Sequence, residues 1–217
     1  DSTSVRAGFA FIMVGLGLKL AMFPIHAWLP NAYTYAPSVV SIFLAATSTK
    51  VAIYVLLRFM FTVFGYEFPV VELSMSAIFM PLALLAMFIA SAIAVFQTDF
   101  KRLLAYSSVA QIGYMILGFS MASVTGLTAT MVHIFNHAAM KGVLFMVAGA
   151  VVYRVGSSSV ASFAGLGRQM PWTMAALVIG GLSLIGVPLT VGFISKWYLI
   201  LGALETGDWI IAFAIVL

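Results

Sequence analysis

Long apolar segments limit what this chain can fold into more than any other feature of its sequence. A helix crosses the hydrocarbon core of a bilayer with about 20 apolar residues, whereas a barrel strand alternates polar and apolar residues over about 10. We therefore predict an all-α, polytopic transmembrane helix bundle with six full spans and the start of a seventh. The predicted spans cover residues 7–29, 37–64, 74–96, 103–122, 126–153, 172–203 and 208 onward.

The composition excludes a water-soluble domain. Only 7% of the 217 residues are charged, 64% are hydrophobic, and the mean hydropathy is +1.16. A soluble domain carries about 25% charged residues, so we expect this surface to face the lipid bilayer. The isoelectric point near 9.5 does not indicate nucleic acid, because the sequence has no basic face with interleaved aromatic residues.

We expect residues 1–217 to form a single transmembrane domain of a longer membrane protein, because the last apolar run, WIIAFAIVL, is cut short. The sequence has no cysteine. Thiolate zinc sites, cysteine-ligated iron–sulfur clusters and disulfides are therefore excluded within it.

Basic residues in the connections predict the orientation of the bundle. Cytoplasmic connections of membrane proteins carry an excess of Lys and Arg. Four such residues fall on one side of the predicted bundle and two on the other: Lys101, Arg102, Arg154 and Arg168 against Arg6 and Arg58. We predict a multi-pass protein of the cell's inner (plasma) membrane, with the connections 97–102 and 154–168 on the cytoplasmic side.

Two of the predicted spans contain a helix break. Span 172–203 would be about 48 Å long as one straight helix, against a hydrocarbon core of about 30 Å. It contains Pro188, and span 7–29 contains Pro24. Proline removes a backbone donor and clashes with the preceding turn, so we expect both helices to be interrupted there. Two interrupted helices in matching positions are typical of an inverted-repeat transporter fold.

Four lysines lie near the centres of predicted spans, without an Asp or Glu there: Lys19, Lys50, Lys141 and Lys196. A charge at the centre of a membrane costs about 2.5–3.5 kcal/mol on insertion scales. Snorkelling to the interface accounts for Arg58, Lys101 and Arg154 at span ends, but not for central lysines. The four central lysines therefore indicate a function.

The segment HIFNHAAMKG places His133, His137 and Lys141 at i, i+4 and i+8, which is one face of a helix. A zinc site is disfavoured because a lysine repels a metal ion and no carboxylate or thiolate is close in sequence. Haem ligation needs histidines on opposite faces of the iron, and a structural role is the plain alternative for either histidine. Because histidine titrates near neutral pH, we predict a proton relay with no metal and no cofactor.

His26, in the segment FPIHAWLP, lies near the cytoplasmic end of its predicted span. Two interpretations remain open for it. It is either a gate at the mouth of the proton path or an interfacial histidine beside Trp28.

Four segments carry a family resemblance, in this order: KLAMFPIHAWLPNAYTYAPSVVSIFLAATSTKVAIYVLLR, TDFKRLLAYSSVAQIGYM, HIFNHAAMKGVLFMVAGAV and GVPLTVGFISKWYL. Together they resemble the antiporter-like subunits of respiratory complex I and of Mrp-type cation/proton antiporters. The wording PIHAWLPNAYTYAPSVVSIFLAAT is most similar to the D-subunit group of the Mrp branch. The resemblance covers nearly the whole chain.

The resemblance implies about fourteen helices in the whole subunit, with two inverted five-helix repeats. It also implies a role for each titratable residue of the spans. Lys19 would be the central switch on the seventh helix, paired with a fifth-helix glutamate that these residues do not include. Lys50 would link the half-channels. The eleventh helix would supply His133, His137 and Lys141, and the twelfth would supply Lys196 near the outer exit.

The expected function is proton translocation through this lysine and histidine relay, in a subunit of a multisubunit monovalent cation/proton antiporter. An alternative is a proton-pumping subunit of an NADH:quinone oxidoreductase or a membrane-bound hydrogenase complex. A redox enzyme that holds quinone, haem or metal is disfavoured by the lack of cysteine and of opposed histidines. A structural scaffold subunit is disfavoured by the central lysines. We expect no catalytic chemistry within the chain itself.

The expected partners are lipid, other membrane subunits and protons. Sodium prefers oxygen ligands, and the spans offer lysines and histidines instead. We therefore expect this chain to carry protons, and any sodium or potassium path to lie elsewhere.

Overall fold

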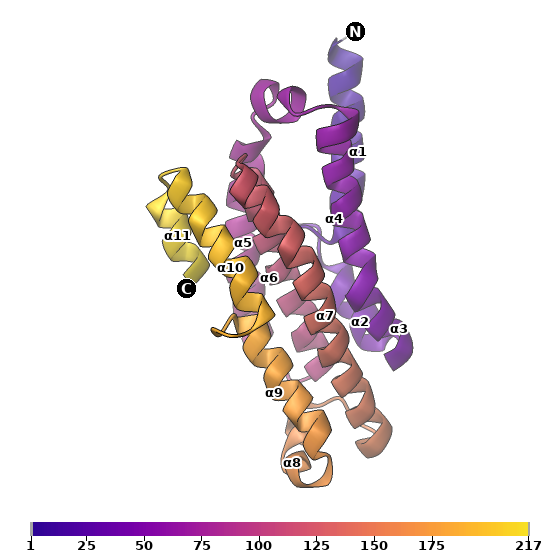
Figure 1. The fold of residues 1–217 in the computed structure, drawn as a ribbon. Coiled ribbons are helices and arrows are strands. Elements are labelled where there is room, and N and C mark those ends of the chain that lie inside the picture. Colours follow the sequence, from indigo (N-terminus) through magenta and orange to yellow (C-terminus); the bar gives the residue numbers. More distant parts are fainter. Residues whose placement is uncertain (1, 217) are drawn as a thin grey trace.

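The computed structural model describes residues 2–216, so both ends of the predicted domain, Asp1 and Leu217, lie outside the described residues. The described residues form a bundle of helices without a β-strand (Figure 1), which confirms the predicted all-α fold. The α-helices are α1 Ser2–Leu20, α2 Trp28–Tyr35, α3 Ser38–Phe43, α4 Thr49–Arg58, α5 Met75–Val95, α6 Phe100–Ser120, α7 Val124–Val155, α8 Leu166–Gln169, α9 Pro171–Ile185, α10 Val191–Glu205 and α11 Trp209–Val216. Three π-helical segments, Leu44–Ser48, Phe59–Val63 and Glu67–Glu72, and one 3₁₀ turn, Val160–Phe163, complete them.

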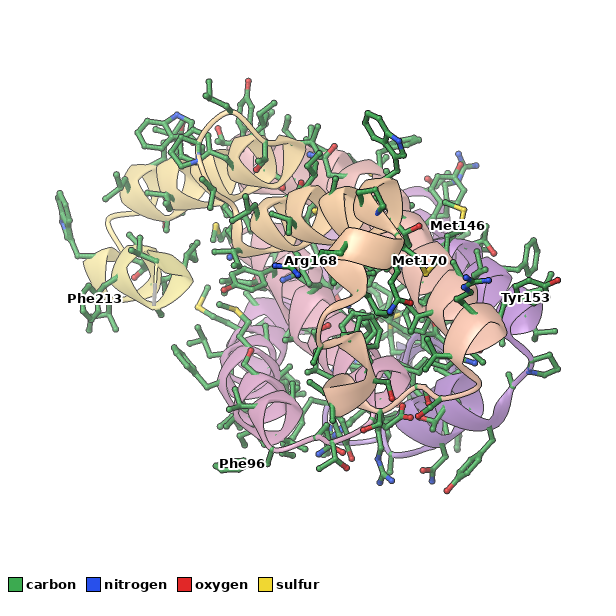
Figure 2. The ribbon with its side chains drawn as sticks, turned by 90° about the horizontal axis from the view of Figure 1, so that it is seen from below. Phe96, Met146, Tyr153, Arg168, Met170 and Phe213 are labelled. Atoms are coloured by element: carbon green, nitrogen blue, oxygen red, sulfur yellow. The ribbon has the colours of Figure 1, made fainter. Side chains whose placement is uncertain are left out.

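Five helical segments of the described residues are long and apolar enough to cross a membrane. They are Thr3–Leu20, Ser38–Val63, Met75–Val95, Phe100–Ser120 and Val124–Val155. Large apolar side chains cover the outside of the bundle, and Phe96, Tyr153 and Phe213 project outward all round it (Figure 2). Such a surface suits lipid and not water, so the chain is a multi-pass membrane protein.

The predicted span 7–29 is two helices. α1 ends at Leu20, the chain then follows an irregular path through Pro24, and α2 begins at Trp28. The indole Nε1 of Trp28 donates a hydrogen bond of 2.8 Å across the break to the carbonyl oxygen of Leu18. One of the carbonyl groups freed at the end of α1 is therefore satisfied.

The predicted span 172–203 is also two helices, α9 and α10, which form one interrupted column in Figure 1. α9 ends at Ile185, and Gly186 follows in the left-handed region with φ 91°. Glycine adopts this conformation without a steric penalty and commonly ends helices. Pro188 lies in the break, and α10 begins at Val191.

The second span runs without a break from α3 through α4, but Leu44–Ser48 within it is π-helical. This π segment packs against α7, where Gly142 faces Ala46. The hydroxyl of Tyr33 on α2 donates to the carbonyl of Leu44 at 3.1 Å. Single π turns inside α-helices are frequent at functional sites, and this one ends two residues before Lys50.

α6 is the central helix of the bundle. It packs most extensively against α5, and it also contacts α7 and α2. Nearly all of its residues are buried. The buried polar side chains of α6, among them Ser108 and Gln111, therefore face other helices and not the lipid.

The connections 97–102 and 154–168 lie together at one end of the bundle. The backbone N–H of Val160 donates to the carbonyl of Thr98 at 2.9 Å. The two connections therefore face the same side of the membrane, as the basic residues predict. That this side is cytoplasmic stays a prediction.

The expectation that Lys101 snorkels to the interface is wrong. Its side chain is buried, and its Nζ lies 3.4 Å from the carbonyl oxygen of Ala36 at the end of α2. The long contact between α2 and α6 encloses the lysine, which the position of Lys101 near a span end does not reveal. Arg58 and Arg154 are exposed.

Candidate proton-relay site

Three titratable side chains of α7 point into the bundle. His133, His137 and Lys141 are all at most 1% exposed. Their spacing of four residues places them in a row along one face of α7, about 6 Å apart. This face packs against α6, α10 and the π segment Leu44–Ser48.

His133 joins three helices through its imidazole ring. Its Nδ1 lies 2.8 Å from the hydroxyl oxygen of Ser195 on α10, and its Nε2 lies 2.8 Å from the side-chain oxygen of Gln111 on α6. The Ser195 hydroxyl also lies 3.0 Å from the carbonyl oxygen of Gly192. A hydroxyl has one proton, so Ser195 donates either to Gly192 or to His133.

This hydrogen-bond pattern fits both protonation states of His133. In the neutral state, Nε2–H donates to Gln111 and Nδ1 accepts from Ser195. In the protonated state, both ring nitrogens donate, and Ser195 turns its proton to the carbonyl of Gly192. The site can therefore take up and release a proton at Nδ1 without leaving a partner of His133 unsatisfied.

His137 has a different environment. It is fully buried, and neither of its ring nitrogens has a hydrogen-bond partner among the described residues. Buried polar groups are nearly always hydrogen-bonded, so such an exception calls for a functional explanation. The ring of His137 is parallel to that of His133, with centroids 5.9 Å apart.

Lys141 and Lys50 continue the row toward the π segment. The ammonium of Lys141 donates to the carbonyl of Leu104 at 2.7 Å and to the hydroxyl of Ser107, both on α6. The ammonium of Lys50 is buried and donates to the carbonyl of Ala45 inside the π segment. The π segment to which Lys50 donates packs against α7, where Gly142, the residue after Lys141, faces Ala46.

Lys196 lies at the other end of the row. Its Nζ donates to the carbonyl of Ile185, the last residue of α9, at 2.8 Å. The same Nζ is 4.7 Å from the ring centroid of Tyr114 on α6. A cavity of about 300 Å³ opens beside it and is lined by Ser91, Gln111, Tyr114, Leu184, Ile185, Lys196 and Val216.

Two predicted residues lie apart from this row. Lys19 is exposed in the last turn of α1, with no hydrogen bond or ion pair to another described residue. His26 is half-buried in the break between α1 and α2, stacked on Phe23 at 5.3 Å and edge-on to Tyr106 at 6.5 Å. Pro24 lies in the same break.

Sequence reasoning missed four side chains that complete the site: Ser107, Gln111, Tyr114 and Ser195. Three of them follow one another on α6 at i, i+4 and i+7 in the segment AYSSVAQIGYM. A polar stripe at helical spacing within an apolar span was the available signal. Ser195 belongs to no such polar stripe, so the sequence did not indicate it.

The described residues contain no group of three or more His, Cys, Asp or Glu side chains that could hold a metal ion. The row consists instead of basic and neutral polar groups. Such groups can accept, hold and donate protons.

Comparisons with known proteins place the chain among membrane subunits of respiratory and antiporter complexes. A family model described as "NADH:quinone oxidoreductase/Mrp antiporter, TM" matches residues 1–217. NADH-quinone oxidoreductase subunit N of Desulforudis audaxviator is 44% identical over 210 residues, which are 97% of this chain and 42% of that protein. Hydrogenase-4 component B of Escherichia coli is 32% identical over 203 residues, which are 88% of this chain and 30% of that protein.

Solved structures agree with these relatives. The Mrp complex from Dietzia sp. DQ12-45-1b contains a chain that superposes with a TM-score of 0.91 at 29% identity, over 99% of this chain and 39% of that one. An archaeal membrane-bound sulfane sulfur reductase contains one with a TM-score of 0.87 at 34% identity, over 100% of this chain and 45% of that one. The chain therefore spans less than half the length of the relatives it matches.

Proposed function

The chain belongs to the NADH:quinone oxidoreductase/Mrp antiporter family of membrane proteins, and we propose that it translocates protons through its buried row of lysines and histidines. The observation that carries this proposal is the alignment of five titratable side chains in one row inside the bundle. The row leads from Lys50 through Lys141, His137 and His133 to Lys196, beside the cavity next to α11.

Charge repulsion couples neighbouring sites of the row to one another. Neighbouring cations destabilise one another in a low-dielectric interior, so a proton that arrives at one site favours release from the next. The neutral hydrogen-bond partners on α6 and α10 hold the side chains without trapping the proton as a carboxylate would.

We propose further that the chain works within a multisubunit monovalent cation/proton antiporter, together with other membrane subunits in a cell's inner membrane. The Mrp complex structure, with its TM-score of 0.91, supports this setting. A second setting is a proton pump of a redox complex, such as an NADH:quinone oxidoreductase. The identity of 44% to a subunit N favours it. Both settings use the same proton path.

Lys19 has a separate role in this proposal. Its side chain is exposed on α1 within an otherwise apolar span. An exposed ammonium at that depth would be costly against lipid. We propose that helices outside the described residues cover this face of α1 and pair Lys19 with a carboxylate, as the family resemblance implies.

Substitution of Lys141 tests the proposal in the complete assembly. Lys141→Arg keeps a positive charge that cannot be released at neutral pH, and Lys141→Met removes the charge. We expect both variants to lose proton flux, measured with a pH-sensitive dye in liposomes without sodium or potassium. Arg168→Met, at an exposed connection, is the matched control and should transport normally.

Sodium flux provides the opposing test. The test removes every other subunit that could carry sodium and measures tracer sodium uptake. Uptake that continues in the unsubstituted protein but disappears in Lys141→Met would contradict proton transport through this row. So would normal proton flux in an assembled Lys141→Arg variant.

A further inference from the structure

Tyr114 contacts two consecutive members of the proton row. The centroid of its ring lies 6.1 Å from that of His133, and the Nζ of Lys196 lies 4.7 Å from the ring centroid. Its side chain is largely buried on the central helix α6. The aromatic ring therefore lies where a proton would pass from His133 to Lys196.

Two contacts of Lys196 act on its charged form at this position. A cation is attracted by the face of an aromatic ring, whereas a neutral amine is not. The carbonyl of Ile185, which Lys196 contacts at 2.8 Å, belongs to the C-terminal end of α9, where the helix dipole also favours a cation. The aliphatic part of Lys196 packs over Gly186, where a Cβ would come within 2.9 Å of the lysine Cδ.

We propose that Tyr114 is a positioning residue that holds protonated Lys196 at the outer cavity and releases it once the proton has left. The neutral lysine loses its attraction to the ring and can turn toward His133 for the next proton. The ring thus separates two events at the last step of the row: the uptake of a proton by Lys196 from His133, and the release of that proton from Lys196. This inference rests on the proposed function of the row.

The ring of Tyr114, and not its hydroxyl, carries this role. The hydroxyl makes no hydrogen bond to another described residue, and the contact to Lys196 is to the ring face. Tyr114→Phe should therefore retain proton flux within about twofold. Tyr114→Leu should lower it by about tenfold, which corresponds to the range of a buried cation–π contact.

Fluorinated phenylalanines at position 114 separate positioning from packing. Each fluorine withdraws electron density from the ring face and weakens its attraction for a cation, while the shape hardly changes. We expect proton flux of the complete assembly to fall stepwise from phenylalanine through mono-, di- and trifluoro-phenylalanine. The same series at Phe119, a buried aromatic residue of α6 that contacts Phe79 and no cation, should leave flux unchanged.

A flat response to fluorine at position 114, with flux lost in Lys196→Met, would overturn this inference and leave the proposed function intact. Normal flux in Lys196→Met would instead overturn the proposed function. The fluorine series does not depend on Tyr114→Leu, so a failure of that variant to assemble leaves the test complete.

Discussion

The imidazole rings of His133 and His137 are parallel, with their planes 5° and their centroids 5.9 Å apart, but among the described residues only His133 finds hydrogen-bond partners. The two residues are one helical turn apart on the same face of α7. Their difference arises from the neighbouring helices. These helices place the polar side chains of Gln111 and Ser195 beside His133, but no hydrogen-bonding group of the described residues beside His137. The contrast gives opposite expectations for their substitution.

His137→Leu should stabilise the protein and slow transport. The two unpartnered ring nitrogens of His137 are buried at a cost, since each such group typically costs about 1–3 kcal/mol. Leucine removes this cost but cannot carry a proton. Thermal unfolding of the detergent-solubilised assembly should occur at a higher temperature, while dye-monitored proton flux falls.

His133→Leu is the matched comparison and should unfold at a lower temperature, because it leaves Gln111 without its partner. Equal flux in His137→Leu and the unsubstituted assembly would refute a proton-carrying role for His137.

Ser195→Ala should slow proton flux through its effect on His133. The substitution removes the hydroxyl that donates to Nδ1 of neutral His133 and accepts from Nδ1 of protonated His133, so both protonation states lose a hydrogen bond. The loss is about 1 kcal/mol for the neutral ring and about 1.5–3 kcal/mol for the charged ring. We expect flux to fall about fivefold and its solvent isotope effect in D₂O to rise, since a proton transfer becomes rate-limiting. Ser120→Ala is the control, because Ser120 is buried and bonds only the carbonyl of Leu117 in its own helix. If the solvent isotope effect on proton flux is the same in Ser195→Ala as in the unsubstituted assembly, Ser195 serves packing alone and the prediction is wrong.

Asp99→Ala should destabilise the protein without altering the proton path. Asp99 is the N-cap of α6, where its carboxylate accepts from the backbone N–H of Arg102 at 2.9 Å and from the hydroxyl of Ser158. Loss of an N-cap costs about 1 kcal/mol. We expect a lower unfolding temperature, with flux per assembled complex preserved. Glu205→Ala is the control, because Glu205 is exposed and its carboxylate has no hydrogen bond or ion pair to another described residue. It should not lower the unfolding temperature, and an equal drop in both variants would contradict the capping role.

Single cysteines should be labelled from opposite sides of the membrane. Ala164 is exposed in the connection 154–168, and Val71 is exposed near the ion pair of Arg6 with Glu72, whose atoms are 3.9 Å apart. Residues 1–217 contain no cysteine, so within them the label reports on Ala164→Cys or Val71→Cys alone. In intact cells, an impermeant maleimide should modify Val71→Cys alone. Labelling of Ala164→Cys from outside would reverse the predicted orientation.

Much of the fold follows from local features of the sequence. Apolar segments of about 20 residues must be helical in a bilayer, since every backbone group needs an internal partner there. The interruptions around Pro24 and Pro188 follow from the geometry of proline and from Gly186 at the end of α9. The row on α7 follows from helical spacing alone, because residues four apart share a face.

Contacts between helices could not be obtained in this way. Gln111 and Ser195 meet His133 from 22 and 62 residues away in the sequence, and the burial of Lys101 depends on how α2 crosses α6. The placement of Lys196 over Tyr114 likewise depends on the packing of α10 against the central helix. A single helix determines which of its residues share a face. Only the packed bundle decides which side chains of other helices meet that face, because crossing angles and the path of each break depend on all the contacts together.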